Sequence, residues 1–89
     1  MRRVIWTDEA VANLDNIATY IQDFSPLAAQ RLAVRLKNAA DSLAAQSDRG
    51  RSVGNGYREL VVIYPYLIRY KVDADIVRIM RIRRGARRP

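Results

Sequence analysis

The chain is predicted to form an α+β domain in which a helical hairpin packs on one face of a mainly antiparallel four-stranded sheet, in the order β-α-α-β-β-β. Apolar residues recur every three or four positions in the first half of the sequence and alternate with polar ones in the second half. The composition, 49% hydrophobic and 28% charged, is ordinary for a globular protein. With 89 residues the chain has room for one core, so we expect a single domain over residues 1–89.

A short strand and a helix are predicted at the N-terminal end. Residues 2–6 are rich in β-branched and aromatic side chains, which favours a strand. Thr7 is suited to cap the following helix, and Asp8 and Glu9 place negative charge where the helix dipole favours it. The predicted apolar face of this helix consists of Val11, Leu14, Ile17, Ile21 and Phe24.

A second helix is predicted to begin at Pro26, with Ser25 as its N-cap. Because the break between the two helices is short, we expect them to lie antiparallel as a hairpin. The predicted apolar stripe of the second helix consists of Ala28, Leu32, Leu36, Ala39 or Ala40, and Leu43.

Three strands are predicted in the second half, after a loop over residues 47–56. They cover residues 57–63, 66–72 and 76–83, and a tight turn at 73–75 joins the last two. The sheet face turned away from the helices should be partly open and strongly basic. Alternation is clearest in the middle strand, where one face carries Tyr66, Ile68, Tyr70 and Val72 and the other carries Leu67, Arg69 and Lys71.

Positive charge is concentrated in the second half of the chain. The formal net charge is +7, and 14 of the 16 basic residues are arginine. Residues 1–48 carry five basic and six acidic side chains, whereas residues 49–89 carry eleven and three. Arginine favours bidentate contacts with carboxylates and phosphates, so we expect an anionic partner, either nucleic acid or an acidic protein segment.

Several kinds of chemistry are excluded by residue types that the sequence lacks. Without cysteine there are no disulfides, thiolate nucleophiles or cysteine-based zinc sites, and without histidine the commonest general base is missing. Asp8 and Glu9 suit a helix cap, and Asp73 and Asp75 suit a turn, so we expect no metal and no cofactor. No apolar run is long enough for a signal peptide or a membrane span, and we expect a cytoplasmic protein.

Two segments are candidates for binding an anion. Residues 78–88 contain six arginines, a density typical of an anion-binding surface, and the alternative is a solvated strand edge followed by a frayed terminus. Gly50, Gly54 and Gly56 lie in a loop that could cradle phosphate, but the Walker pattern is missing, which favours a plain connector.

Four tyrosines lie among the basic strands, where aromatic rings could stack on nucleic-acid bases. Tyrosine is also common in half-buried strands. The four residues are Tyr57, Tyr64, Tyr66 and Tyr70, and for Tyr66 and Tyr70 packing in the core is the favoured interpretation.

Several short motifs, in this order and spacing, resemble the RelE/ParE superfamily of type II toxin–antitoxin toxins. They include the strand end at Trp6-Thr7, the helix break at Ser25-Pro26, and the strand motifs YRELVV (57–62), YLIRYKV (66–72) and VRIMRIRRGAR (77–87). The similarity runs through nearly the whole chain. The fold that it implies is the one that the periodicity predicts.

Two activities occur in this superfamily. RelE-like toxins cleave messenger RNA in the ribosome, whereas ParE-like toxins inhibit DNA gyrase. The RelE-like pattern has lysines in the first strand after the loop, an arginine after the tyrosine of the next strand, and a tyrosine or histidine near the C-terminus. Leu60 and Leu67 occupy two of these positions here, and Arg84 stands where many relatives have histidine. The resemblance therefore favours a ParE-like gyrase inhibitor; the alternatives are a ribosome-dependent endoribonuclease and a small basic nucleic-acid-binding module.

The resemblance also implies partners and site residues. We predict that the target is bound by Arg81, Arg83, Arg84, Arg87 and Arg88. No catalytic residue is expected in a gyrase inhibitor. In a nuclease the set would be Arg58, Glu59 and Arg83, with Glu59 as base; otherwise Arg58 and Glu59 form a structural ion pair.

A cognate antitoxin is the expected protein partner. It would contribute an acidic, partly disordered segment that folds on binding. The candidate contacts on this chain are Leu14, Ile17 and Ile21, whose alternative role is core packing.

Overall fold

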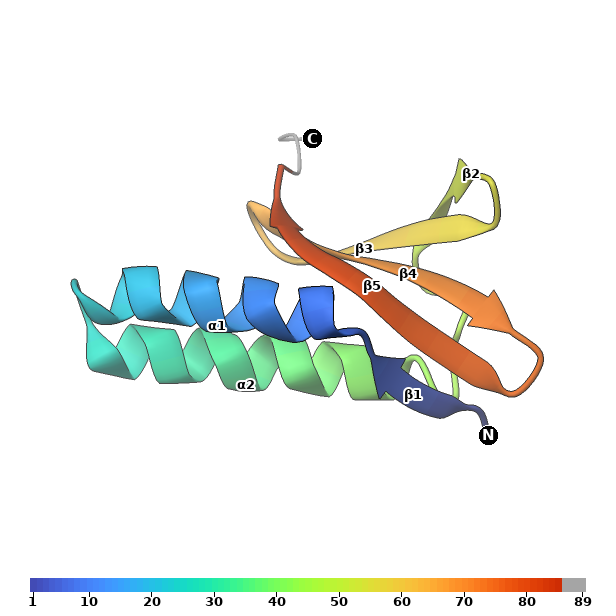
Figure 1. The fold of residues 1–89 in the computed structure, drawn as a ribbon, viewed down its shortest axis with the longest axis horizontal. Helices are drawn as coiled ribbons and strands as arrows, with labels where there is room; N and C mark the ends of the chain where they lie inside the picture. The colour runs from blue at the N-terminus through green and yellow to red at the C-terminus, as the bar shows by residue number, and fades with distance from the viewer. Residues whose placement is uncertain (86–89) are drawn as a thin grey trace.

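The computed structural model describes residues 1–85, which form two helices and one sheet (Figure 1). The elements in chain order are β1 (Arg3–Trp6), α1 (Asp8–Gln22), α2 (Pro26–Ser42), β2 (Arg51–Gly54), β3 (Tyr57–Ile63), β4 (Tyr66–Asp73) and β5 (Ile76–Arg84). The strand order is β1-β5-β4-β3-β2; β1 runs parallel to β5, and the other neighbours are antiparallel. The predicted α+β class and mainly antiparallel sheet are therefore confirmed.

The predicted four-stranded sheet is wrong by one strand, β2. Residues 47–56 were expected to be a loop, but Arg51 pairs with Glu59, and β2 adds a fifth strand next to β3. The chain reverses through Gly54, Asn55 and Gly56, whose φ angles are 93°, 56° and 81°. Glycine adopts positive φ without steric cost and asparagine does so more readily than most residues, so this segment forms a hairpin turn.

Both predicted helix caps are confirmed. The Thr7 hydroxyl accepts a hydrogen bond from the Ala10 amide at the start of α1, and the Ser25 hydroxyl accepts one from the Ala28 amide at the start of α2; both measure 3.1 Å. Each cap satisfies one of the amides that a helix end leaves without an intrahelical partner. The caps therefore fix where the two arms of the hairpin begin.

The predicted apolar faces of the helices are correct except at three positions. Val11 and Phe24 are exposed, and Ala28 is exposed whereas Ala29 is buried. Phe24 lies beyond the end of α1, and Val11 is about 90° around the helix from the buried stripe, at 100° per residue. That stripe runs through Ala10, Leu14, Ile17 and Ile21.

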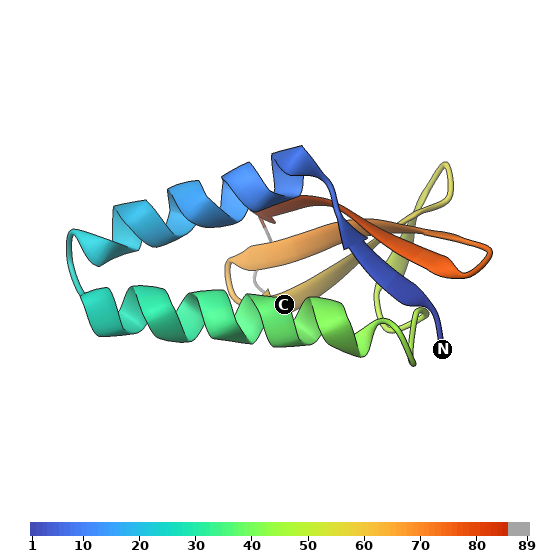
Figure 2. The same ribbon diagram turned by 60° about the horizontal axis from the view of Figure 1, so that its bottom comes forward.

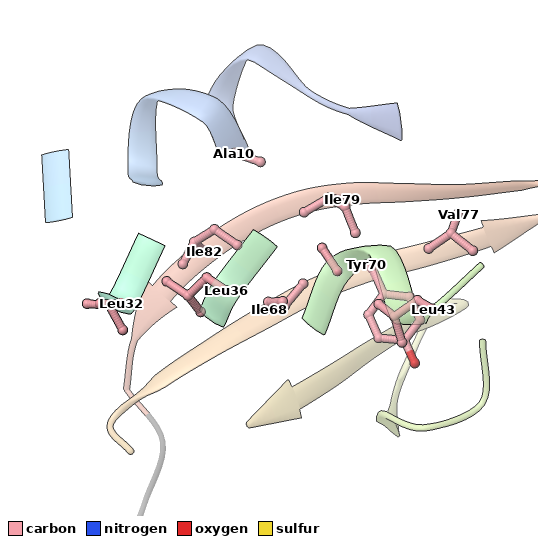
Figure 3. Packing of buried hydrophobic residues seen from close by; sticks show 10 residues of the cluster. Ala10, Leu32, Leu36, Leu43, Ile68, Tyr70, Val77, Ile79 and Ile82 are labelled. Atoms are coloured by element: carbon pink, nitrogen blue, oxygen red, sulfur yellow. The ribbon is translucent and has the colours of Figure 1, made fainter. Parts of the chain in front are cut away.

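The hydrophobic core lies between the helices and the middle of the sheet (Figure 3). The helices contribute Ala10, Leu32, Leu36, Ala40 and Leu43, and the strands contribute Ile68, Tyr70, Val77, Ile79 and Ile82. The helices lie side by side on one face of the sheet, and the end of the hairpin projects beyond it (Figures 1 and 2). Neither helix within residues 1–85 combines the length and apolar character of a membrane span.

Candidate functional site

Five basic side chains of the neighbouring strands β4 and β5 gather on the sheet face that points away from the helices. We call this surface the basic face; it consists of Arg69 and Lys71 of β4 and Arg78, Arg81 and Arg83 of β5. Strand pairing sets Lys71 opposite Arg78 and Arg69 opposite Arg81. Like charges directly opposite each other on neighbouring strands destabilise a sheet, so this arrangement opposes folding and is typical of a surface that binds an anion.

A bulge in β5 brings Arg81 and Arg83 to the basic face. The pairing between β4 and β5 shifts by one residue after Arg69, and Met80 becomes the extra residue. Ile79 before the shift and Ile82 after it are both buried. Without the extra residue, strict alternation would turn Ile82 outwards and Arg81 into the core.

Glu59 of β3 is a buried carboxylate within the basic face. Its side chain is 7% exposed, and its Oε2 atom accepts a hydrogen bond from Arg69 Nε at 2.9 Å and lies 2.7 Å from Arg69 Nη2. Arg83 Nη1 lies 4.0 Å from the same oxygen. A buried carboxylate without a partner would be strongly unfavourable, so the structure commits the Arg69 guanidinium to Glu59.

A shallow pocket lies where the start of α1 meets the basic face. Its lining residues are Thr7, Glu9, Tyr57, Arg69, Met80 and Arg81. The Tyr57 ring centroid is 5.3 Å from Lys71 Nζ and 5.9 Å from Arg69 Cζ, so cations already lie over the ring. Arg81 Nε is 3.0 Å from Glu9 Oε2, and both side chains are about half-exposed. Such an exposed ion pair is weak, so a bound anion can replace Glu9.

The predicted target-binding residues are only partly brought together. Arg81 and Arg83 lie on the basic face, but Arg84 pairs with Tyr66 and so points to the opposite face of β5. Arg87 and Arg88 lie outside the described residues. The sequence placed Arg69 and Lys71 together on one face of the middle strand and Arg78 in the arginine-rich segment, but none of the three was among the predicted target-binding residues. The alternation in β4 was the signal for the first two.

The residues expected for a nuclease are not all brought together either. Glu59 and Arg83 approach each other, but Arg58 follows the alternation of β3 and points to the other face. There its Nη1 atom donates a hydrogen bond to the Gly50 carbonyl at 2.6 Å. The predicted Arg58–Glu59 ion pair is therefore wrong, and Arg69 takes the place of Arg58. Among residues 1–85, no three acidic side chains are close enough to hold a metal ion.

Tyr70 anchors the loop before β2, and its predicted core position is confirmed. Its hydroxyl accepts a hydrogen bond from the Gly50 amide at 2.8 Å and donates one to the Ser47 carbonyl at 2.7 Å. Burial raises the pKa of the Tyr70 hydroxyl above its usual value. Because the Gly50 amide is bound to Tyr70, it is not available to a phosphate, which supports the connector interpretation of this loop.

A second candidate surface runs along the outer side of α2 towards β3. We call it the α2 groove; it consists of three adjoining hollows that share Arg35. Leu27 and Val34 expose 53% and 52% of their surface there, and Arg31 lies between them in sequence. Ile63 of β3 lines the hollow nearest the start of α2. The groove therefore combines exposed apolar side chains with positive charge.

The predicted antitoxin contacts lie elsewhere, on α1. Leu14, Ile17 and Ile21 are half-buried and pack against the core. The packing therefore supports the alternative interpretation, in which these three residues belong to the core. Little of their surface is left for a partner. The α2 groove was missed because only the buried stripe of α2 was considered, although Leu27 and Val34, seven residues apart, lie together on the opposite side of the helix.

Comparison with known proteins places this architecture in a family. Residues 4–89 match the family described as ParE toxin of type II toxin-antitoxin system, parDE. The chain belongs to the ParE toxin family. It is 56% identical to Toxin RelE2 of Caulobacter vibrioides, over 98% of this chain and 99% of the relative. It is 33% identical to Toxin RelE1 of the same organism, over 92% of this chain and 91% of the relative.

Solved structures agree with this assignment. The chromosomal ParDE system from P. aeruginosa contains a chain that is 28% identical to this toxin, with a TM-score of 0.81 over 96% of this chain and 97% of that one. YafQ from E. coli shares the fold at 19% identity, with a TM-score of 0.56 over 97% and 96% of the two chains. The protein is therefore a type II toxin–antitoxin toxin of the RelE/ParE superfamily.

Proposed function

We propose that this toxin arrests growth by binding DNA gyrase through the basic face, and that a cognate antitoxin neutralises it in the cytoplasm. The observation that carries the proposal is the basic face itself, in which five cations lie on two neighbouring strands and one of them, Arg69, is paired with Glu59. Gyrase inhibition is the activity of the ParE branch, to which the resemblance points. On this account toxicity depends on contacts spread over the surface, and not on one reacting atom.

The geometry of Glu59 supports binding over RNA cleavage. Cleavage through the 2′-hydroxyl needs a group that can accept its proton. Glu59 of β3 lies opposite Arg69, and its Oε2 atom faces two nitrogens of that arginine at 2.9 and 2.7 Å. A 2′-hydroxyl can therefore approach this oxygen only after the ion pair with Arg69 opens.

Ribosome-dependent RNA cleavage is the second candidate function. Relatives named RelE toxins, one of them 56% identical over nearly the whole chain, favour it. So does the 4.0 Å approach of Glu59 and Arg83, two of the three residues expected for a nuclease. In that case Glu59 would act as base after Arg69 moves away, and Arg83 would stabilise charge on the phosphate.

The α2 groove is the proposed antitoxin site. A helix with apolar side chains on one face can fill the groove around Leu27 and Val34, and acidic residues beside them would pair with Arg31 and Arg35. The antitoxins named with the ParDE and DinJ-YafQ structures make such a partner the expected one for this chain. Leu14, Ile17 and Ile21 are then left to the core.

Induced expression in bacteria distinguishes the two functions. We expect growth arrest with loss of plasmid supercoiling and no new mRNA ends. Glu59→Gln should remain toxic, because it removes no cation from the basic face. Asp41→Asn, which removes a carboxylate from an exposed ion pair on α2, is the matched control. Specific mRNA cuts that disappear with Glu59→Gln, at unchanged protein level, would contradict the proposal and establish the nuclease.

Binding assays with the product of the neighbouring gene test the antitoxin site. Val34→Glu should weaken the complex, because it places a carboxylate among apolar side chains that face an acidic partner. Val11→Glu makes the same change at an exposed apolar position on α1 and should leave affinity unchanged. Equal affinities of the two folded variants would show that the antitoxin does not bind in the α2 groove.

A further inference from the structure

We propose that the basic face binds the phosphate backbone of duplex DNA without regard to base sequence. This inference rests on the proposed function in one respect, because the DNA held by gyrase is the part of the target that we expect the basic face to contact. It does not require gyrase, since the contacts involve the toxin and DNA alone.

The surface chemistry of the basic face favours DNA over a protein partner. Protein interfaces have an apolar centre, whereas protein–DNA interfaces are polar and strongly positive. Leu67, the aliphatic side chain opposite Arg83, is 3% exposed and so adds almost no apolar surface to the face. Val61, the exposed apolar residue opposite Leu67, also lines a hollow of the α2 groove. The two surfaces of the toxin thus suit different classes of partner.

The spacing of the cations suits a row of phosphates. Because of the bulge, Arg78 and Arg83 lie opposite Lys71 and Leu67, which are four positions apart in β4, or about 13 Å at about 3.3 Å per residue. This distance spans about four base pairs at about 3.4 Å each. The pairs Lys71–Arg78 and Arg69–Arg81 add a second row on β4. A polyanion laid across both rows would relieve the repulsion within each pair, which a single carboxylate cannot do.

The aromatic chemistry of the face favours a duplex over a single strand. Proteins that bind single strands stack bases on exposed aromatic rings. Tyr57 lies on this face, but Lys71 Nζ and Arg69 Cζ lie 5.3 and 5.9 Å from its ring centroid. Bases therefore find no free ring there, and contact is limited to phosphates. Duplex DNA presents phosphates at the highest density, since it carries two strands.

The ion pair of Glu59 sets the number of cations that DNA can neutralise. Arg69 is committed to this carboxylate, and the other four side chains of the basic face remain. Each neutralised phosphate contributes about −0.9 to the slope of log affinity against log salt, so four give about −3.6. Raising salt from about 50 to about 200 mM should then weaken binding about 150-fold.

Fluorescence anisotropy with a short fluorescein-labelled DNA duplex of mixed sequence tests the inference. Arg81→Gln and Arg78→Gln should each weaken binding and reduce the salt slope by about 1. Lys37→Gln is the matched control for Arg81→Gln, because Lys37 is also exposed and also lies 3.0 Å from a carboxylate, that of Asp41, but on α2. It removes the same charge from the chain and should leave the slope unchanged.

Four results would overturn the inference. They are no binding by the folded wild-type chain, an equal loss for Lys37→Gln and Arg81→Gln, tighter binding to a single strand of the same length, and competition by polyglutamate as effective as by unlabelled duplex. The last would assign the face to an acidic protein segment, and tighter single-strand binding would assign it to base stacking. Gyrase inhibition is measured separately, so loss of DNA binding with inhibition intact would overturn this inference alone.

Discussion

Replacing Glu59 by glutamine should lower stability and at the same time strengthen anion binding. Glutamine keeps the size of the side chain and one oxygen that can accept a hydrogen bond from Arg69, but it removes the charge. Hydrogen bonds to a charged group contribute about 1.5–3 kcal/mol, and neutral ones contribute about 1 kcal/mol. Arg69 is partly exposed, and water screens the pair to that extent. We therefore expect the free energy of unfolding to fall by about 1–2 kcal/mol.

Urea unfolding followed by the fluorescence of Trp6 measures this change. For a domain of this size the melting temperature should fall by about 5–15 °C. Duplex DNA should bind more tightly to the folded variant, since the basic face loses the negative charge of Glu59. Asp41→Asn, in the exposed pair with Lys37, should change stability by only a few tenths of a kcal/mol.

Two results would refute this reasoning. If Glu59→Gln changed stability no more than Asp41→Asn, the carboxylate would not be holding Arg69. If stability fell but DNA affinity fell as well in the folded variant, Glu59 would be positioning the arginines for binding and not opposing the anion by its charge.

Three further changes test the packing that supports the two surfaces, each by urea unfolding followed by circular dichroism. Tyr70→Phe removes the hydroxyl that bonds to Gly50 and Ser47 and should cost about 2 kcal/mol. Because burial raises the pKa of Tyr70, the contribution of its hydroxyl to the free energy of unfolding is fully present below pH 10.0 and is lost as pH rises through the folded-state pKa. The wild type should therefore lose stability in alkali more steeply than Tyr70→Phe. If stability fell equally with pH in both proteins, Tyr70 would not be responsible for the loss. Gly50→Ala should lower the free energy of unfolding by about 1–3 kcal/mol, because the added Cβ would lie 2.8 Å from the Tyr70 ring and 2.9 Å from the Glu59 carbonyl oxygen. An unchanged urea midpoint would show that the surrounding atoms shift to make room at little cost. Leu36→Ala, in the core, should cost about 2–5 kcal/mol, whereas the exposed Leu27→Ala should cost far less, and similar losses would contradict the assignment of Leu27 to a free surface.

Much of the fold could be predicted because it depends on local chemistry. Thr7 and Ser25 mark the helix starts through short-range hydrogen bonds, and β3 has the bounds that its β-rich composition predicts. Strand β2 was missed, although Asn55-Gly56 is the residue pair that a tight hairpin favours. A glycine-containing segment was interpreted as a loop because β2 itself is short and only weakly apolar.

The candidate site was less predictable because it depends on how strands pair. The Glu59–Arg69 ion pair follows from the register between β3 and β4, which no local pattern determines. The bulge at Met80 does leave a trace, since the buried positions change phase between Ile79 and Ile82. That phase change would have placed Arg81 and Arg83 on the same face as Arg69 before the structure was known.

Inhibition of purified DNA gyrase tests the central claim most directly. The account predicts that the wild-type toxin and Lys37→Gln block supercoiling equally, and that the double variant Arg78→Gln/Arg81→Gln is much weaker although it is folded. Supercoiling that proceeds unchanged in the presence of the folded wild-type toxin, together with cleavage of mRNA by the same preparation on translating ribosomes, would contradict it.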